Sequence, residues 1–199
     1  MRIETLGRFQ RVSLSPGEYF ASTDSVTIST LLGSCVAACL FDPVKQIVGM
    51  NHFLLGNRRY ARHMPISATD AGRYGVHAME LLINEMMRLG AGRKSLRAKA
   101  FGASTIMSNT SEAGNFFCVG EINARFIREF LANEGIPLMA EDLGGEKGRV
   151  IHFSNGDYTV FVRKIERLRS ERLARRDQAV WRRAIEHQEM TMPSVDLWR

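Results

Sequence analysis

Two amphipathic helical segments, set among short strand-like runs, constrain the fold of this chain more than any other feature. The first follows a helix-cap candidate at Thr69 or Asp70, repeats apolar residues at helical spacing over residues 74–89, and stops at Gly90. The second shows the same spacing over residues 122–131 and stops at Gly135. Apolar side chains three and four positions apart share one helix face, and a glycine just beyond them ends a helix. The pattern therefore predicts two helices that each bury one face.

Short runs of β-branched and aromatic residues surround these helices and are bounded by turn-forming residues. An Asp-Pro turn at Asp42 predicts a hairpin between two of the runs, and Asn155-Gly156 predicts a turn between two others. Alternating strands and helices favour an α/β or α+β fold, a layered α/β sandwich with a mixed β-sheet. The predicted strands lie at residues 18–21, 26–29, 36–41, 47–55, 96–101, 136–140, 149–153 and 158–162.

Composition along the chain predicts three parts. Residues 1–17 are polar and end in a Ser-Pro-Gly turn signal, so we interpret them as a loose N-terminal arm. Residues 18–165 hold all the predicted core elements and form the expected domain. Residues 166–199 are rich in arginine and helix-forming, with apolar positions too sparse for a full core stripe. We interpret this last part as a basic helical extension.

Charge and cysteine content exclude several classes of protein. The net charge is +6, and +4 of this excess of Lys and Arg over Asp and Glu lies in residues 163–199. A nearly neutral body with a basic tail is not typical of a nucleic-acid-binding domain. No apolar run has the length of a membrane span, and no secretory signal is visible at the N-terminus. Three cysteines without regular spacing argue against a disulfide scaffold, so we expect a cytoplasmic protein.

One cysteine and one histidine are the candidates for chemistry. Cys35 directly follows Gly-Ser at the front of an apolar run, and His52 lies 17 positions later in the predicted partner strand. A thiol presented by a glycine turn beside an imidazole is a plausible pair of nucleophile and base. Backbone N–H groups in the turn at residues 33–35 are also placed to stabilise an oxyanion. The predicted hairpin brings the two side chains toward one end of the sheet.

A packing role is the alternative for both residues. Cysteine is among the most buried residue types, and a lone histidine in an apolar strand is usually a hydrogen-bonded core residue. Cys39 lies about 13 Å from Cys35 if residues 36–41 are extended, too far for a shared metal or a disulfide. The other four histidines lack metal-ligand spacing, so neither a metal nor a cofactor is predicted. From residue patterns alone, both interpretations of Cys35 and His52 stay open.

Several ordered blocks of sequence are similar to the CheD family, the chemoreceptor glutamine deamidases of bacterial chemotaxis. The resemblance runs from about Pro16 to Ile165. It implies a layered α/β sandwich similar to the catalytic domain of cytotoxic necrotizing factor toxins. Three positions depart from the family pattern: Ala103 replaces a second glycine, Ile122 an arginine and Gly56 a proline. The matching blocks are residues 32–37, 49–55, 98–103, 119–124, 135–138, 140–145 and 160–163.

The resemblance implies a cysteine amidohydrolase, a protein-glutamine glutaminase. Cys35 would attack a glutamine carboxamide and form a thioester, which water then hydrolyses to glutamate, with His52 as the acid and base. The family's third residue is a threonine six positions before the cysteine, where this chain has Ser29. We expect the Ser29 hydroxyl to orient His52, and we expect Thr30 to face the other side of its strand.

The implied substrates are glutamine side chains on the cytoplasmic helices of chemoreceptors, the methyl-accepting chemotaxis proteins. A CheC-type phosphatase is a further implied partner, whereas nucleic acid and insertion into a membrane are not expected. One alternative is a regulatory protein that docks on receptors or on a CheC-type phosphatase with little catalysis. Another is a cysteine hydrolase with a different amide substrate, such as a transglutaminase-like activity.

Overall fold

The computed structural model describes residues 1–6, 9–54, 70–105, 113–166 and 179. Ten strands in the described residues form two five-stranded sheets, which we call sheet A and sheet B. In sheet A the order is β1 (Arg2–Leu6), β2 (Phe9–Leu14), β4 (Val26–Leu32), β9 (Arg149–Ser154) and β10 (Val160–Lys164). In sheet B the order is β3 (Tyr19–Ser22), β6 (Ile47–Asn51), β5 (Val36–Asp42), β7 (Arg97–Gly102) and β8 (Leu138–Leu143).

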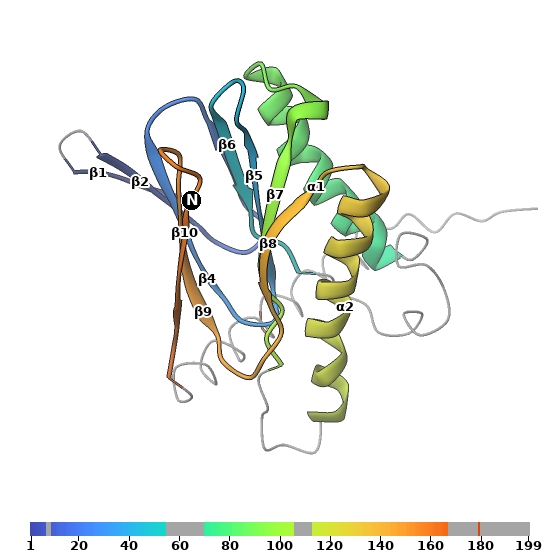
Figure 1. Cartoon of the computed structure of the whole chain (residues 1–199). Coiled ribbons are helices and arrows are strands. Elements are labelled where there is room, and N and C mark those ends of the chain that lie inside the picture. Colours follow the sequence, from blue (N-terminus) through green and yellow to red (C-terminus); the bar gives the residue numbers. More distant parts are fainter. Residues whose placement is uncertain (7–8, 55–69, 106–112, 167–178, 180–199) are drawn as a thin grey trace, which may run out of the picture.

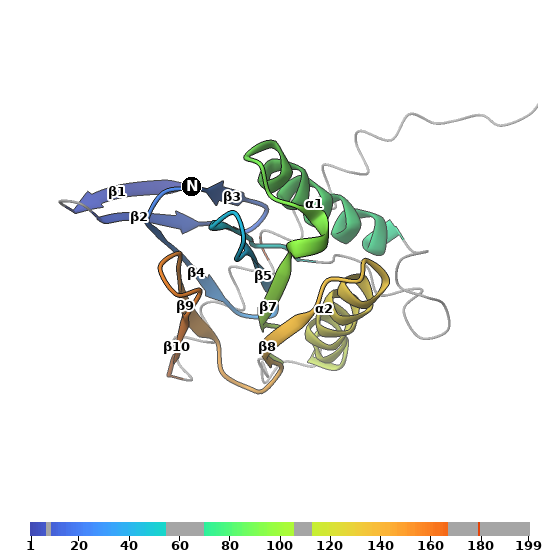
Figure 2. The same ribbon diagram turned by 45° about the horizontal axis from the view of Figure 1, so that its top comes forward.

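The molecule has three layers: sheet A, sheet B, and a pair of helices. Helices α1 (Asp70–Arg88) and α2 (Ala113–Asn133) both cover the face of sheet B that is turned away from sheet A (Figures 1 and 2). Each sheet is mixed, because β2 pairs with β4 and β7 with β8 in parallel, whereas the other neighbours are antiparallel. The predicted α+β architecture is thus confirmed, with two facing sheets. Its likeness to the necrotizing factor domain stays a prediction.

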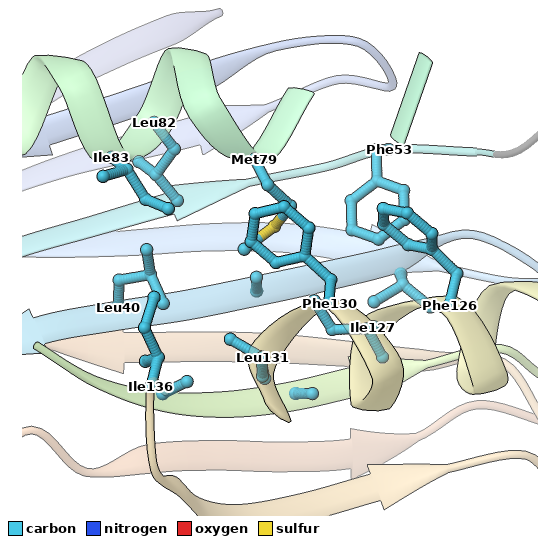
Figure 3. Close-up of a cluster of buried hydrophobic side chains, with 14 of the residues drawn as sticks. Leu40, Phe53, Met79, Leu82, Ile83, Phe126, Ile127, Phe130, Leu131 and Ile136 are labelled. Carbon is cyan, nitrogen blue, oxygen red and sulfur yellow. The ribbon is translucent and has the colours of Figure 1, made fainter. Parts of the chain in front are cut away.

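The two helices bury the faces that the sequence pattern predicts. Helix α1 covers the strand predicted at residues 47–55 so closely that a Cβ atom on Gly49 would lie 2.7 Å from Leu82 Cδ1. Phe126 of α2 meets Phe53 edge-on, with 5.6 Å between the ring centroids. Figure 3 shows this cluster filling the space between the helices and sheet B. Its buried members include Leu40, Phe53, Met79, Leu82, Ile83, Phe126, Ile127, Phe130, Leu131 and Ile136.

A second core lies between the two sheets. Strand β5 is buried along its whole length, because successive side chains point alternately to the helices and to sheet A. Its residues Val36, Ala38 and Leu40 belong to the helix-side cluster. Cys35, which precedes the strand, belongs to the cluster between the sheets, as does Cys39. Cys35 therefore lies in the layer between the sheets.

The N-terminal segment is not a loose arm. Residues 2–6 and 9–14 form β1 and β2, and β2 pairs with β4 inside sheet A. Val12 is fully buried and Leu14 is 6 % exposed, while Ser13 between them and Arg11 before them are polar. Alternation of this kind is typical of a strand with one solvated face. The prediction of an arm at residues 1–17 is wrong because one apolar face on a short strand buries enough to hold it in the sheet.

The predicted hairpin at Asp42 is confirmed by the antiparallel pairing of β5 with β6. One carboxylate oxygen of Asp42 accepts the N–H of Val44 at 2.8 Å, and the other accepts the N–H of Gly92 at 2.7 Å. The side chain thus ties the hairpin to the segment between α1 and β7. The expected basic extension at residues 166–199 lies outside the described residues, apart from its positions 166 and 179. Neither described helix is long and apolar enough to cross a membrane.

Candidate active site

The turn at residues 33–35 is held in place by hydrogen bonds to its backbone carbonyls. The carbonyl of Gly33 accepts the N–H of Ser104 at 2.8 Å, and that of Cys35 accepts the N–H of Ala103 at 2.7 Å. Between them, the carbonyl of Ser34 accepts the side-chain amide of Asn123 at 2.7 Å. These contacts join the turn to the end of β7 and to α2, so the Cys35 thiol is presented by a fixed backbone.

Close backbone approach explains the glycine that ends β7. A Cβ atom on Gly102 would lie 2.2 Å from the carbonyl oxygen of Cys35, and the φ angle of Gly102 is 116°. Only glycine adopts such an angle without strain, and only glycine leaves room for the Cys35 carbonyl. Ala103 follows with a φ of 57°, in the left-handed region where its Cβ atom costs about 1–2 kcal/mol. This is a position where the resembled family has glycine.

His52 is buried just after β6, and its backbone is held by the N-terminal segment. Its carbonyl accepts the N–H of Gly17 at 2.7 Å, and its own N–H donates to the carbonyl of Glu18 at 2.9 Å. The imidazole Nδ1 atom lies 2.8 Å from the hydroxyl oxygen of Thr30 on β4. His52 is only 1 % exposed. Sheet A and the turn before β3 therefore fix the ring between the two sheets.

The Thr30 hydroxyl determines which nitrogen of His52 carries the proton. A hydroxyl has one proton to donate, and that of Thr30 is donated to the carbonyl of Leu14 at 2.8 Å. The Thr30 oxygen must then accept the hydrogen bond from His52, so Nδ1 carries the proton. In the neutral ring, this tautomer puts the lone pair on Nε2. His52 is thereby oriented as a base through its Nε2 atom.

The strand register places Cys35 and His52 on neighbouring segments of sheet B. Val36 and Phe53 exchange two backbone hydrogen bonds of 2.9 Å, which extends the pairing of β5 with β6. In this register His52 lies opposite Ala37, and Cys35 lies two residues further along the same face. Such diagonal neighbours in an antiparallel pair are about 7–8 Å apart and within reach of long side chains. The nucleophile candidate and the base candidate share one end of sheet B.

Ser29 is on the other face of β4, which corrects the expectation that its hydroxyl orients His52. The Ser29 hydroxyl lies 2.7 Å from Nδ1 of His152, its cross-strand partner on β9. Successive side chains of a strand point to opposite faces, so Ser29 and Thr30 cannot both face sheet B. Thr30 points inward to His52, and Ser29 points outward. Spacing from the cysteine identified the strand but selected the wrong face.

Cys39 has an environment that suppresses thiol reactivity. It is fully buried in the cluster between the sheets, and burial raises the pKa of its thiol far above the usual value. Because the thiolate is the nucleophilic form, burial of this kind disfavours reaction at Cys39. Cys35 is also fully buried. It differs from Cys39 in its position at the turn beside His52.

Tyr74 of α1 and Glu18 flank the pair, and sequence reasoning missed both. Burial, together with the repulsion that a Cys35 thiolate would exert, raises the pKa of Tyr74, although 44 % of the residue is exposed. Its hydroxyl lies 3.8 Å from where a Cβ atom of Gly17 would stand. The Glu18 carboxylate pairs with the amino group of Met1. The alternation of Val12 and Leu14 is the signal that could have placed this segment beside the site.

No metal centre accompanies this site in the part of the chain that the structure describes. There, no three His, Cys, Asp or Glu side chains gather in a way that could hold a metal ion. The chemistry that the geometry supports is nucleophilic attack by a thiol, with an imidazole as its proton acceptor and a hydroxyl that fixes the imidazole.

Comparison with known proteins identifies relatives along the whole chain. The family model for CheD, described as CheD chemotactic sensory transduction, matches residues 57–164. The "Probable chemoreceptor glutamine deamidase CheD 1" of Geobacter sulfurreducens is 57% identical over 198 residues, covering 100% of this chain and 98% of that protein. The protein with the corresponding name CheD 2 in Shewanella oneidensis is 48% identical over 157 residues, covering 78% of this chain and 77% of that protein.

Among solved structures, similarity is much weaker. The Bacillus licheniformis hypothetical protein YfiH has a TM-score of 0.35 at 15% identity, covering 62% of this chain and 49% of that one. The Neisseria meningitidis protein NMB0706 has a TM-score of 0.35 at 14% identity, covering 64% and 51% of the two chains. Likenesses at this level carry no argument about this site.

Proposed function

The chain belongs to the CheD family of chemotactic sensory transduction proteins, and from this premise we propose that it hydrolyses glutamine side chains of chemoreceptors to glutamate. The full-length identity of 57% to a relative with that printed activity supports the reaction. The single structural observation that carries it is the hydrogen-bond chain from Leu14 through Thr30 to His52, beside Cys35. This series of hydrogen bonds positions a candidate general base next to a candidate nucleophile.

In the first half of the proposed reaction, His52 Nε2 accepts the thiol proton of Cys35. The thiolate adds to the carboxamide carbon of glutamine, and the carbonyl π electrons move to oxygen. When this tetrahedral intermediate collapses, the C–N bond breaks and His52 returns the proton to the departing nitrogen as ammonia forms. The product of this half is a thioester between Cys35 and the substrate.

In the second half, water replaces ammonia. His52 accepts a proton from the attacking water, a second tetrahedral intermediate forms, and the C–S bond breaks. The thiolate of Cys35 regains a proton from His52, and the substrate leaves as glutamate. The net change is hydrolysis of one amide bond, with no oxidant, metal or cofactor consumed. The Nδ1–H to Thr30 bond holds the ring through both halves, so Nε2 stays the atom that exchanges protons.

The proposal includes the partners and the compartment. The substrates would be glutamine side chains on the cytoplasmic helices of chemoreceptors. A CheC-type phosphatase would compete with the receptors for the same surface of this protein. The chain would act in the cytoplasm. A serine where the resembled family has threonine favours the alternative of a binding protein with little turnover only if Ser29 is the residue that orients His52. Thr30 supplies the hydroxyl on His52, so a serine at position 29 no longer argues against catalysis.

Intact-mass measurement of a chemoreceptor cytoplasmic fragment tests this function. Incubation with the full chain should add about one dalton for each amide converted to an acid, with no covalent adduct remaining. The Cys35→Ala variant should leave the mass unchanged. Retained receptor binding without any mass change in the wild type would overturn the deamidase proposal in favour of a binding protein. Incorporation of an added amine would indicate a transglutaminase-like reaction instead.

A further inference from the structure

We propose that Asn123 is a positioning residue that turns the Ser34–Cys35 peptide so that the Cys35 N–H stabilises the oxyanion of the reaction. This inference rests on the proposed deamidase function and names a group for which that mechanism has no role. Asn123 lies on α2, far from Cys35 in sequence, and is fully buried. Its Nδ2 atom donates to the carbonyl of Ser34 at 2.7 Å.

The packing of α2 brings this amide to the turn. A Cβ atom on Gly120 would lie 2.5 Å from the carbonyl oxygen of Ala103, so the helix backbone approaches the end of β7 directly at this point. Asn123 follows Gly120 by three residues and therefore lies on the same helix face, about one turn further on. The glycine removes the side chain that would hold α2 away, and the asparagine then reaches Ser34.

Peptide geometry converts this hydrogen bond into an orientation of the Cys35 N–H. The chain has no cis peptide bonds in its described residues, so the Ser34 carbonyl and the Cys35 N–H point in opposite directions across one planar unit. The Ser34 carbonyl accepts its hydrogen bond from Asn123 of α2. Helix α2 lies on the outer face of sheet B (Figure 2). The Cys35 N–H is therefore directed to the inner face of sheet B, the side on which the His52 ring meets Thr30.

Charge develops on this inner side during the reaction. When the Cys35 thiolate adds to the carboxamide carbon, the former carbonyl oxygen becomes an anion. A backbone N–H of the nucleophile itself lies close to that oxygen, because only two bonds separate its Cα atom from the sulfur. Donors fixed before the reaction are the effective ones, and loss of one such donor typically lowers kcat by 10²–10³-fold. Asn123 fixes the donor by holding the opposite end of its peptide.

Two substitutions separate this role from a general contribution to folding. Asn123→Ala removes the donor, and Asn123→Asp keeps the shape but places a carboxylate against the Ser34 carbonyl. We expect kcat for the receptor fragment to fall about 10²-fold in both, with KM changed by less than about threefold. Alkylation of Cys35 by iodoacetamide should stay within about twofold of the wild-type rate, because substitution at a saturated carbon forms no oxyanion.

A matched control uses a second buried amide with the same chemistry. Asn155 donates its side-chain N–H to the carbonyl of Asp24 at 2.6 Å, in a turn remote in sequence from the site. Asn155→Ala should lower thermal stability without changing kcat. Parallel losses of deamidation and alkylation in the Asn123 variants would overturn the positioning role, as would an unchanged kcat. If the wild type itself left the receptor mass unchanged, the deamidase proposal would fail first, and the two failures are distinguishable.

A measurement on the wild-type protein keeps the proposal testable if both Asn123 variants fail to fold. The probe is a receptor-derived peptide with an aldehyde in place of the glutamine carboxamide. The Cys35 sulfur would add to the aldehyde carbon and give a tetrahedral hemithioacetal. The Cys35 amide proton should then shift downfield in the NMR spectrum, as hydrogen bonding to the new oxygen deshields it. Addition of the aldehyde without movement of this resonance would contradict the inference.

Discussion

Strand β4 carries a hydroxyl–histidine pair on each of its faces, and the two pairs have nearly the same geometry. Ser29 and His152 are joined at 2.7 Å on the outer face of sheet A, and Thr30 and His52 at 2.8 Å on the inner face. The surroundings differ. The Thr30 hydroxyl donates a hydrogen bond to the carbonyl of Leu14, and its histidine lies beside a cysteine. Two hydroxyl–imidazole contacts of nearly the same length therefore stand in different settings, and the proposed base is the one that lies beside a cysteine.

The outer pair lies in a different electrostatic environment. His152 is half-buried, and this burial, together with the positive charges of Arg11 and Arg163, lowers the pKa of its imidazole. All three residues are on the solvent side of sheet A, since the register of β2, β4, β9 and β10 places them there. In the proposed mechanism the inner pair acts in catalysis, and for the outer pair we propose a structural role within the sheet.

The largest expected difference between the pairs is in deamidation itself. Cys35→Ala and His52→Ala should each lower the rate by a factor on the order of 10⁴ or more, since each removes a reacting group. His152→Ala should stay within about twofold of the wild-type rate. The measurement is the time course of mass gain on a receptor fragment. A comparable loss in His152→Ala would show that the outer pair is part of the site.

The two hydroxyls should differ next. Thr30→Val removes the acceptor for His52 Nδ1 while preserving side-chain shape, so the ring loses its fixed tautomer and kcat should fall about 10²-fold. The same change leaves the Leu14 carbonyl without its Thr30 donor and should lower the free energy of unfolding by about 1–3 kcal/mol. Ser29→Ala should leave kcat unchanged. Rescue by Thr30→Ser would confirm the hydroxyl as the cause, whereas equal rates for Thr30→Val and wild type would contradict the assignment.

The residues on the two faces of β4 were not equally predictable from the sequence. Cys35 and His52 could be picked out because a Gly-Ser-Cys turn and a histidine in the next strand are local signals. The choice between Ser29 and Thr30 depends on which face of β4 meets sheet B, and a strand with buried residues on both sides does not show this parity. Only the packing of the two sheets determines it.

The contacts that hold the site in place could also not be predicted from local sequence patterns. Asn123 reaches Ser34 across 89 positions, and Leu14 reaches Thr30 through a parallel pair of strands. Such contacts depend on tertiary packing, which overrides local propensity. The departure at Ala103 was visible in the sequence, and the structure gives its physical meaning as a non-glycine residue at positive φ. Predicted helices agreed best, because helical spacing over many residues is the most redundant signal.

Thiol reactivity should separate two cysteines of the same buried layer. Cys35 lies beside the oriented histidine, and Cys39 lies in an apolar interior that raises the pKa of its thiol. At pH 7 iodoacetamide should label Cys35 at least about tenfold faster than Cys39 in the folded chain. Peptide mapping by mass spectrometry measures both positions at once. Faster labelling of Cys39 would show that access of the reagent, and not thiolate formation, determines which of the two cysteines reacts.

The smallest expected effect concerns pH and the outer histidine. The folded chain lowers the pKa of His152 below its usual value of 6.5, so near and below that pH the unfolded chain binds more protons there. The contribution of His152 to stability is therefore complete above about pH 6.5 and is lost as the pH falls through the folded value. The melting-temperature difference between wild type and His152→Gln should decrease from pH 7 to pH 5, by less than about 4 °C. A difference independent of pH would contradict this sign.

The Leu14 carbonyl has a consequence for how the activity is inherited. The three groups of the hydrogen-bond chain from Leu14 through Thr30 to His52, and Cys35 beside it, all precede position 57, where the match to the family model begins. A gene that lost its opening codons would still encode both helices and a recognisable relative. Its product would retain Cys35 yet lack the oxygen that dictates where the His52 proton sits. A relative can therefore inherit the fold without inheriting the proposed catalytic geometry, because that geometry depends on the first strands.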